Sequence, residues 1–378
     1  MKRKIVTDNP TNTKKRKISQ SFLFNHVKIW FPKRDTHPLG GIINEMRLIR
    51  QKELYAFRGE QLLLLTDFQN NEFRDKAYVE DFCKKQGIGL ITTDYVKKEL
   101  RDKAWKDCQI QHKLFEIAMM ELQDPDGLVV IASDIFRILS PVLALGAYSD
   151  IDEKIVVDGD SEEIPELVLN ISIERIEGTI RLRSCNNFIY ARDPDHQILL
   201  THRKNIFKKY TNSNTLFHSK MFTKAAIFKE PFLVDQIILK VFHDLARAFQ
   251  LIPDSIKNPI LFRKALKENY PQHIDLYCYF YVLSCSGPSA LRDTLLFGET
   301  LDIAQISSWS IDLTNLKLTS ENRSNHSDVS WNTKGRIKVQ EETCRIVNAA
   351  LNVQRFWRRR KENSVTDSAI ENPIQTWR

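Results

Sequence analysis

The sequence predicts an α/β protein with a largely parallel sheet. Three short, continuously apolar segments lie near residues 27–31, 61–67 and 88–91, and segments with helical periodicity separate them. Strands of a parallel sheet are apolar throughout because helices cover both faces of the sheet. An alternation of such strands with helices is typical of α/β folds. We therefore expect one sheet flanked by helices.

Size and composition agree with one large core. The chain has 378 residues, of which 42% are hydrophobic and 28% charged, so most of it is expected to fold. No apolar run approaches the roughly 20 residues that span a bilayer, and we expect neither a membrane segment nor a signal peptide. The cysteines are scattered without a C-x-x-C pair, which argues against a zinc site or a disulfide framework.

The net charge of +8 is concentrated at the two ends of the chain. Residues 1–20 carry +6 and residues 355–361 carry +5, so the remainder is slightly acidic at −3. This distribution argues against nucleic-acid binding by the core domain. We expect a disordered basic tail over 1–21 and an ordered domain over 22–335.

The middle of the chain is expected to contain two helices before a short strand. Residues 105–122 have helical spacing, and the Asp-Pro-Asp-Gly turn at 124–127 ends that helix. Ser133 and Asp134 are residue types that cap helices, so we expect the second helix to begin there. Pro141 predicts a kink in that helix.

Two carboxylates, Asp150 and Asp152, follow the short apolar pair at 147–148. In an extended chain, side chains two residues apart point the same way, so these two can share one cation such as Mg²⁺ or Mn²⁺. The same D-x-D pattern occurs at 124–126 and 158–160, which we interpret as a helix-ending turn and a loop. Taken alone, the pattern at 150–152 is typical of an exposed acidic turn.

The second half of the chain completes the expected domain. Strands are expected near 167–173, 179–182 and 185–191, and the aromatic-rich region of about 215–300 predicts a helical subdomain. The polar stretch 307–326 is expected to be a loop. A basic amphipathic helix over 336–362 and a tail over 363–378 are expected to end the chain.

Two segments together resemble the sugar-binding DxD-motif glycosyltransferases. These are Ala-Ser-Asp-Ile-Phe-Arg at 132–137 and Gly-Ala-Tyr-Ser-Asp-Ile-Asp at 146–152. They are similar to the A-S-D-hydrophobic-x-R and G-G-x-Y-x-D-x-D element of that group, which includes the large clostridial glucosylating toxin catalytic domains and related bacterial effector glycosyltransferases. The first aspartates of the two segments lie 16 residues apart, as in the toxins. Leu145 departs from the pattern, because it replaces the first glycine.

This resemblance implies a fold and a set of roles. The fold would be GT-A-like, a Rossmann-like mixed sheet flanked by helices. Asp134 and Arg137 would bind the donor sugar, Asp150 would face the ribose and the metal, and Asp152 would bind the metal. The plain alternatives are a helix cap for Asp134 and a surface charge for Arg137.

Three weaker similarities extend the resemblance. Trp30 is expected at the end of the first strand, where the family's tryptophan stacks on uracil, although a core role is the alternative. Asn187 lies in a segment similar to the family's strand beside the transferred sugar, or is an ordinary turn residue. Residues 286–291 (Ser-Gly-Pro-Ser-Ala-Leu) resemble a family turn, or form a plain loop entering a helix.

A closing loop is expected over residues 325–331. Asn325 and Ser327 resemble the pair that completes the metal site in toxin-like transferases, and Trp331 resembles the indole that closes over the diphosphate. The spacing to Trp331 is shorter than in the related effectors, so Asp328 or Ser330 is the alternative ligand. Trp309 is a rival candidate for the closing role.

The two termini carry separate signals. Basic clusters at 2–4 and 15–17 resemble a bipartite nuclear-import signal, or form a tail that keeps the chain soluble or touches anionic lipid. Residues 349–360 resemble an incomplete IQ motif, in which a calmodulin-like partner would contact Val353, Gln354, Trp357 and Arg358. The alternatives are a helix packed on the domain and a helix bound to anionic lipid.

The sequence and the resemblance together predict a retaining, metal-dependent glycosyltransferase. Its donor would be UDP-glucose or UDP-N-acetylglucosamine with Mn²⁺ or Mg²⁺, and its acceptor a protein, expected in a host cell. We expect a monomeric secreted effector acting in the host cytoplasm or nucleus. The alternatives are a glycan or lipid glycosyltransferase and a catalytically degenerate adaptor that binds calmodulin or acts in the nucleus.

Overall fold

The computed structural model describes residues 24–32, 37–68, 73–157, 164–176, 179–211, 259–269, 271–297 and 303–320. Five expected features therefore lie outside the described residues: the tail over 1–21, the D-x-D loop at 158–160, the closing loop over 325–331, the helix over 336–362 and the tail over 363–378. Of the helical subdomain expected over about 215–300, the structure describes helices from residue 259 onward. Within the part described, no helix combines the length and apolar character needed to cross a bilayer.

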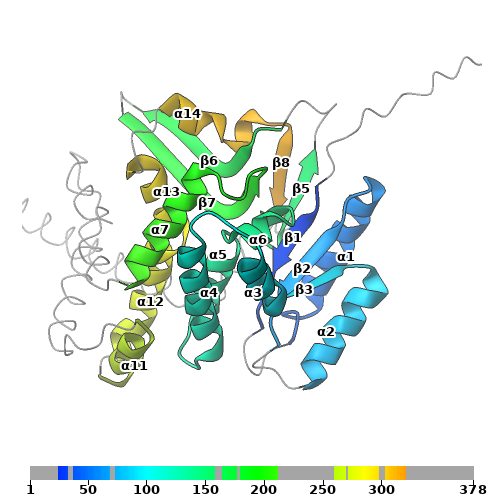
Figure 1. The fold of residues 1–378 in the computed structure, drawn as a ribbon, viewed down its shortest axis with the longest axis horizontal. Helices are drawn as coiled ribbons and strands as arrows, with labels where there is room; N and C mark the ends of the chain where they lie inside the picture. The colour runs from blue at the N-terminus through cyan, green and yellow to red at the C-terminus, as the bar shows by residue number, and fades with distance from the viewer. Residues whose placement is uncertain are drawn as a thin grey trace, which may run out of the picture.

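A six-stranded mixed sheet forms the centre of the domain, in the order β3-β2-β1-β4-β7-β6 (Figure 1). Its strands are β1 (His26–Ile29), β2 (Leu62–Thr66), β3 (Gly89–Thr92), β4 (Ala147–Ser149), β6 (Leu167–Ile176) and β7 (Thr179–Ala191). The first four are parallel, whereas β7 runs antiparallel to both β4 and β6. The expected α/β fold with a mixed sheet is confirmed.

The apolar strands are covered on both faces. In β2, Leu62 and Leu64 pack into a cluster with α1 (Ile42–Phe57) and α2 (Phe73–Gln86). Leu63 and Leu65 point into the large core on the other face, since side chains alternate along a strand. The helices that supply that core are α3 (Thr93–Asp102), α4 (Cys108–Gln123), α5 (Val129–Phe136), α6 (Ser140–Leu143), α7 (Gln197–Thr211), α11 (Pro259–Asn269), α12 (Pro271–Cys285), α13 (Pro288–Phe297) and α14 (Ile303–Ser308).

The expected start of the helix at Ser133 and Asp134 is wrong. Helix α5 begins at Val129, so both residues lie in its second half, and no side-chain cap is formed at its start. The apolar residues before Ser133 continue the helical packing, which overrides the local capping preference. Pro141 does not kink that helix but occupies the first turn of the separate helix α6, where the missing N–H costs nothing.

Two further expectations need correction. The strands expected near 179–182 and 185–191 are one strand, β7, which pairs with β6 through a register shift between Leu169 and Asn170. The expected loop over 307–326 contains the end of α14, a 3-10 turn (Ile311–Leu313) and β8 (Leu316–Ser320), which pairs antiparallel with β5 (Glu153–Val157). Leu316 and Leu318 alternate with polar residues, and this alternation indicates a strand. The high polarity of the whole stretch concealed it.

Gly146 brings β4 close to the segment that precedes β1. Its φ is +153°, and a Cβ added there would lie 2.0 Å from the backbone oxygen of Asn25. We expect Gly146→Ala to lower the free energy of unfolding by about 3 kcal/mol, from backbone strain and displaced packing together. Gly41→Ala is the control, because Gly41 has a φ of +102° with nothing within 4 Å of the added Cβ. It should cost about 1 kcal/mol in urea unfolding. Equal losses for the two variants would contradict the close approach at Gly146.

His202 joins α7 to α13 in the core and is fully buried. Its Nδ1 lies 2.9 Å from Thr294 Oγ1, and that hydroxyl donates its only proton to the carbonyl of Ala290. The histidine Nδ1 is therefore the donor to Thr294. Burial, together with the nearby Lys209 and Arg203, lowers the pKa of His202 to about 3.

This buried histidine predicts a loss of stability in mild acid. The unfolded chain takes up a proton at the ordinary histidine pKa of about 6.5, whereas the folded chain does not until far lower pH. Stability is thus present above the unfolded pKa and falls as pH decreases, by about 2 kcal/mol between about pH 8 and about pH 5. Between the same two pH values, the free energy of unfolding of His202→Gln should therefore fall by about 2 kcal/mol less than that of wild type, as measured by thermal unfolding. Identical pH slopes for the two proteins would contradict a neutral buried His202.

Candidate functional site

The candidate site lies where the carboxyl ends of β1 and β4 meet. The strand order runs β3-β2-β1 in one direction from this point and continues with β4 in the other. In open α/β sheets, ligands bind outside the carboxyl ends of strands at such a switch in strand order. Trp30 follows β1 and Asp150 follows β4, so both expected site residues lie at this edge.

Arg137 lies at the centre of the site and is 5% exposed. Its Nη2 lies 3.1 Å from Asp134 Oδ1, and its Nη1 lies 3.4 Å from Asp150 Oδ1. The same Nη1 donates to the carbonyl of Asn186 at 2.6 Å. The guanidinium also lies 4.5 Å above the centre of the Tyr148 ring. One buried cation therefore joins α5, β4 and β7, which excludes the surface-charge alternative for Arg137.

Asp134 is buried and hydrogen-bonded, as its partner Arg137 is. It is 3% exposed and accepts hydrogen bonds from Asn186 Nδ2 at 2.9 Å and from Ser286 Oγ at 2.8 Å. Burial raises the pKa of Asp134, although Arg137, Ser286 and Asn186 oppose the rise. Its Oδ2 accepts the bond from Ser286, and a carboxylate oxygen has a second lone pair.

The residue Ser286 comes from the expected turn over 286–291. That turn joins α12 to α13 and is closed by the bond from Gly287 N to the carbonyl of Val282. The carbonyl of Pro288 accepts a bond from Ser184 Oγ of β7. The segment therefore enters a helix, as the plain alternative expected, and it is also packed against the site.

The D-x-D segment forms a turn, and the expected extended geometry is wrong. Strand β4 ends at Ser149, and Glu153 N donates to the carbonyl of Asp150 at 3.0 Å. The reason is that β4 pairs with β7 only as far as Ser149, after which the Asp150 N–H bonds to the carbonyl of Asn187. The Tyr148 hydroxyl donates to Asp150 Oδ1, and the Asp150 side chain is 38% exposed. Asp150 therefore belongs to the buried cluster on one side and faces solvent on the other.

Glu153 is a site residue that the sequence interpretation missed. Burial, followed by the nearby Asp152 and Asp150, raises the pKa of Glu153 to about 7. Asn187 Nδ2 donates to Glu153 Oε1 at 3.4 Å, and Asn187 Oδ1 accepts from Asn170 at 2.7 Å. The turn thus concentrates three carboxylates, and Asn187 contacts it. Interpreting Asp-Ile-Asp-Glu as a D-x-D pair concealed the third acid.

The acidic turn has the oxygen ligands that Mg²⁺ and Mn²⁺ prefer, but it does not form a complete metal site by itself. Among the described residues, no group of three or more His, Cys, Asp or Glu side chains is placed to hold a metal ion. Asp150 Oδ1 is already occupied by Tyr148 and Arg137. A cation here would need the remaining oxygens of the turn together with phosphate, water or the expected ligands Asn325 and Ser327, which lie outside the described residues.

The structure describes two of the three tryptophans that were expected or considered at the site. Trp30 is half-buried, donates to the carbonyl of Pro38 at 3.1 Å and packs on Gly40, where an added Cβ would lie 2.4 Å from the ring. Trp309 is 7% exposed and lies in the core with its ring at the edge of His196, so it is not available as a closing indole. Trp331 and Ser330 lie outside the described residues.

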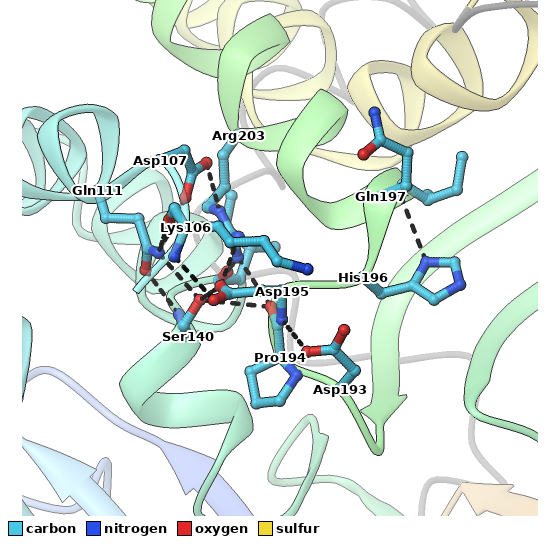
Figure 2. A network of polar contacts seen from close by, with 12 residues as sticks. Lys106, Asp107, Gln111, Ser140, Asp193, Pro194, Asp195, His196, Gln197 and Arg203 are labelled. Atoms are coloured by element: carbon cyan, nitrogen blue, oxygen red, sulfur yellow. Dashed lines mark hydrogen bonds and ion pairs between the residues drawn. The ribbon is translucent and has the colours of Figure 1, made fainter. Parts of the chain in front are cut away.

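A buried polar network holds the segment that follows Arg137 (Figure 2). Arg203 of α7 is fully buried and donates to Asp107 at 3.0 Å and to Asp195 at 3.2 Å. Its Nη1 also donates to the carbonyls of Ile138 and Pro194. Because Ile138 directly follows Arg137, this network fixes the end of α5 against α4 and α7.

The same network holds the start of α6. Ser140 Oγ donates to Asp195 Oδ1 at 2.6 Å, and Ser140 N donates to Gln111 Oε1 at 2.8 Å (Figure 2). At the other end of α5, the N–H of Leu128 donates to the buried Glu121, which pairs with Arg263 at 2.5 Å. Buried charged side chains therefore hold both ends of α5, and they fix the position of this helix relative to β4 and β7.

Comparison with known proteins gives weak likenesses. No protein-family model matches the chain, and no curated protein matches it. Among solved structures, the PaToxG glycosyltransferase is 14% identical, with a TM-score of 0.35 over 75% of this chain and 83% of that one. Two structures of a transferase, one of them a mutant, are 11% identical with TM-scores of 0.31, over 48% and 49% of this chain and 78% of each of those. Likenesses at this level add nothing to the geometry described above.

Proposed function

We propose that the chain is a glycosyltransferase whose donor site is the cluster around Arg137. The observation that supports the proposal is the meeting of Asp134, Arg137 and Asp150 at one point of the sheet edge. Asp134 and Asp150 come from different elements, yet both contact one buried guanidinium. Packing alone does not explain why two carboxylates and an arginine, all buried or half-buried, lie together at this edge of the sheet. Removing such charges from water costs free energy.

The chain's own residues suggest how the site would act. Arg137 holds Asp134 and Asp150 at a fixed separation, and the second lone pair of Asp134 Oδ2 would accept a hydroxyl of the donor sugar. The acidic turn would hold Mn²⁺ or Mg²⁺ with Asp152, and such a cation neutralises charge on a leaving diphosphate when it is bound. Trp30 would offer its ring to the uracil base.

The finer assignments belong to the same proposal. The donor is UDP-glucose or UDP-N-acetylglucosamine, and transfer proceeds with retention onto a protein acceptor, which we place in a host cell. Asn187 is proposed to contact the transferred sugar, and Trp331 with Ser330 to close over the diphosphate. A proton NMR spectrum of the product shows the anomeric configuration and therefore tests retention directly.

A panel of UDP-sugars tests the function. Incubating the protein with each sugar and Mn²⁺ should release UDP from one or two of them, because donor sites hydrolyse the donor slowly when acceptor is absent. Removal of residues 1–21 or of residues 336–378 should leave the release of UDP unchanged. Failure of every UDP-sugar to bind or react would remove the proposal.

A second candidate is a degenerate transferase fold that serves as an adaptor. It is favoured by the saturation of Asp150 Oδ1 by Tyr148 and Arg137, and by the lack of a three-ligand metal group among the described residues. An adaptor would bind no UDP-sugar but would retain a calmodulin-like partner through the segment around Trp357. Calorimetric titration with UDP, with and without Mn²⁺, separates the two candidates.

A further inference from the structure

Lys28 is a buried cation directly beneath the acidic turn. It lies within β1 and is 0% exposed. Its Nζ donates to Ser149 Oγ at 2.6 Å, to the carbonyl of Asp150 at 2.8 Å and to the carbonyl of Glu153 at 2.5 Å. An ammonium group has three N–H donors, so these three acceptors use its full donor capacity.

The fold itself gives no reason for a lysine at this position. Interior strands of a parallel sheet are ordinarily apolar, and a buried ammonium costs several kcal/mol of desolvation unless it is paired and hydrogen-bonded. The neighbouring interior strand β2 has four leucines in succession. These three acceptors belong to residues 149–153, so the end of β4 and the acidic turn together compensate the buried charge of Lys28.

A second buried donor holds the same turn. Gln51 of α1 is fully buried, and its Nε2 donates to the carbonyl of Ile151 at 2.8 Å. The carbonyls of residues 150, 151 and 153 are thus all held by side chains from β1 and α1. Rotation of any of these peptide units would leave a buried donor without its acceptor, which costs about 1–3 kcal/mol.

We propose that Lys28 is a positioning residue, which holds the backbone of residues 150–153 in the conformation that lets Asp150 and Asp152 bind a divalent cation. The inference rests on the proposed metal-dependent function. Lys28 touches neither cation nor substrate and acts through the backbone carbonyls. Its charge alone would have the opposite effect, because a positive charge near a cation site weakens cation binding.

The opposite signs of these two effects make the inference testable. Mn²⁺ affinity is measured by electron paramagnetic resonance in wild type, Lys28→Met and Lys154→Met. Lys154 is half-buried, directly follows Glu153 and provides the matched loss of one positive charge. Lys28→Met should weaken Mn²⁺ binding about tenfold or more, as for other residues that orient metal ligands. Lys154→Met should bind Mn²⁺ equally or more tightly.

Each outcome decides the inference. Equal or tighter binding of Mn²⁺ by Lys28→Met overturns the positioning role while leaving the metal site intact. Lack of binding by wild type overturns both the metal site and the role of Lys28. Should Lys28→Met fail to fold by circular dichroism, Lys28→Gln takes its place, because its amide keeps a polar group there but has only two N–H donors for the three acceptors. That variant should weaken Mn²⁺ binding about tenfold, and unchanged affinity would overturn the inference.

Discussion

Replacement of Arg137 by methionine is expected to lower the free energy of unfolding by about 3–5 kcal/mol, because it leaves the buried Asp134 without its cation. Asp134 is 3% exposed, and Arg137 lies 3.1 Å from its Oδ1. The loss should appear in urea unfolding as a lower midpoint with an unchanged slope. Arg183→Met is the control, because Arg183 pairs with Glu174 at the surface with 69% of its side chain exposed. That variant should lose less than about 1 kcal/mol.

The destabilisation by Arg137→Met should depend on pH and on Asp134. Burial already raises the pKa of Asp134, and removal of the cation raises that pKa further. For an acid whose folded pKa is raised, stability is present at low pH and is lost as pH rises through the folded pKa. The variant should therefore differ least from wild type in acid and most in alkali. Adding Asp134→Asn to it should recover part of the stability, and strict additivity of the two changes would contradict direct pairing.

The second large effect concerns activity. Asp150→Asn combined with Asp152→Asn should lower Mn²⁺-dependent UDP-sugar hydrolysis about a thousandfold or more, because the two proposed metal ligands lose their charge. The fold should survive, since asparagine keeps the size of each side chain. Near-ultraviolet circular dichroism checks this point.

The chain provides a matched control for that double variant. Asp124 and Asp126 form a second D-x-D pattern in the turn that ends α4, as the sequence predicts, and the turn is closed by the bond from Gly127 N to the carbonyl of Asp124. This turn lies beyond the opposite end of α5 from Arg137. Asp124→Asn with Asp126→Asn should leave hydrolysis within about twofold of wild type. If both double variants lost a comparable fraction of hydrolytic activity, surface charge in general, and not the acidic turn after β4, would control the reaction.

The strands of the sheet could be predicted because burial on both faces makes them apolar, as in β2. Lys28 and His26 are the exceptions in β1, and each is fully buried. A local pattern cannot reveal such residues, because their hydrogen-bond acceptors lie far away in sequence. Ser133 and Asp134 misled the prediction for the converse reason, since tertiary contacts to Asn186 and Ser286 explain Asp134 and a helix cap does not.

The candidate site was only partly accessible from the sequence. The resemblance selected Asp134, Arg137 and Asp150, and the structure brings these three together. It could not reveal Glu153, whose raised pKa depends on burial and on its neighbours in a folded turn. It also could not reveal that the D-x-D segment turns after Ser149, because that depends on where β7 stops pairing with β4. Asn325, Ser327 and Trp331 stay predictions.

A crystal structure of the protein with UDP and Mn²⁺ tests the central claim most directly. We expect the cation against Asp150 and Asp152 and the diphosphate beside it, at the carboxyl ends of β1 and β4. The base should lie toward Trp30, and the sugar side of the diphosphate toward Asp134 and Arg137. Nucleotide bound at any other place on the domain, or no bound nucleotide at saturating UDP, would contradict the assignment of this cluster as a donor site.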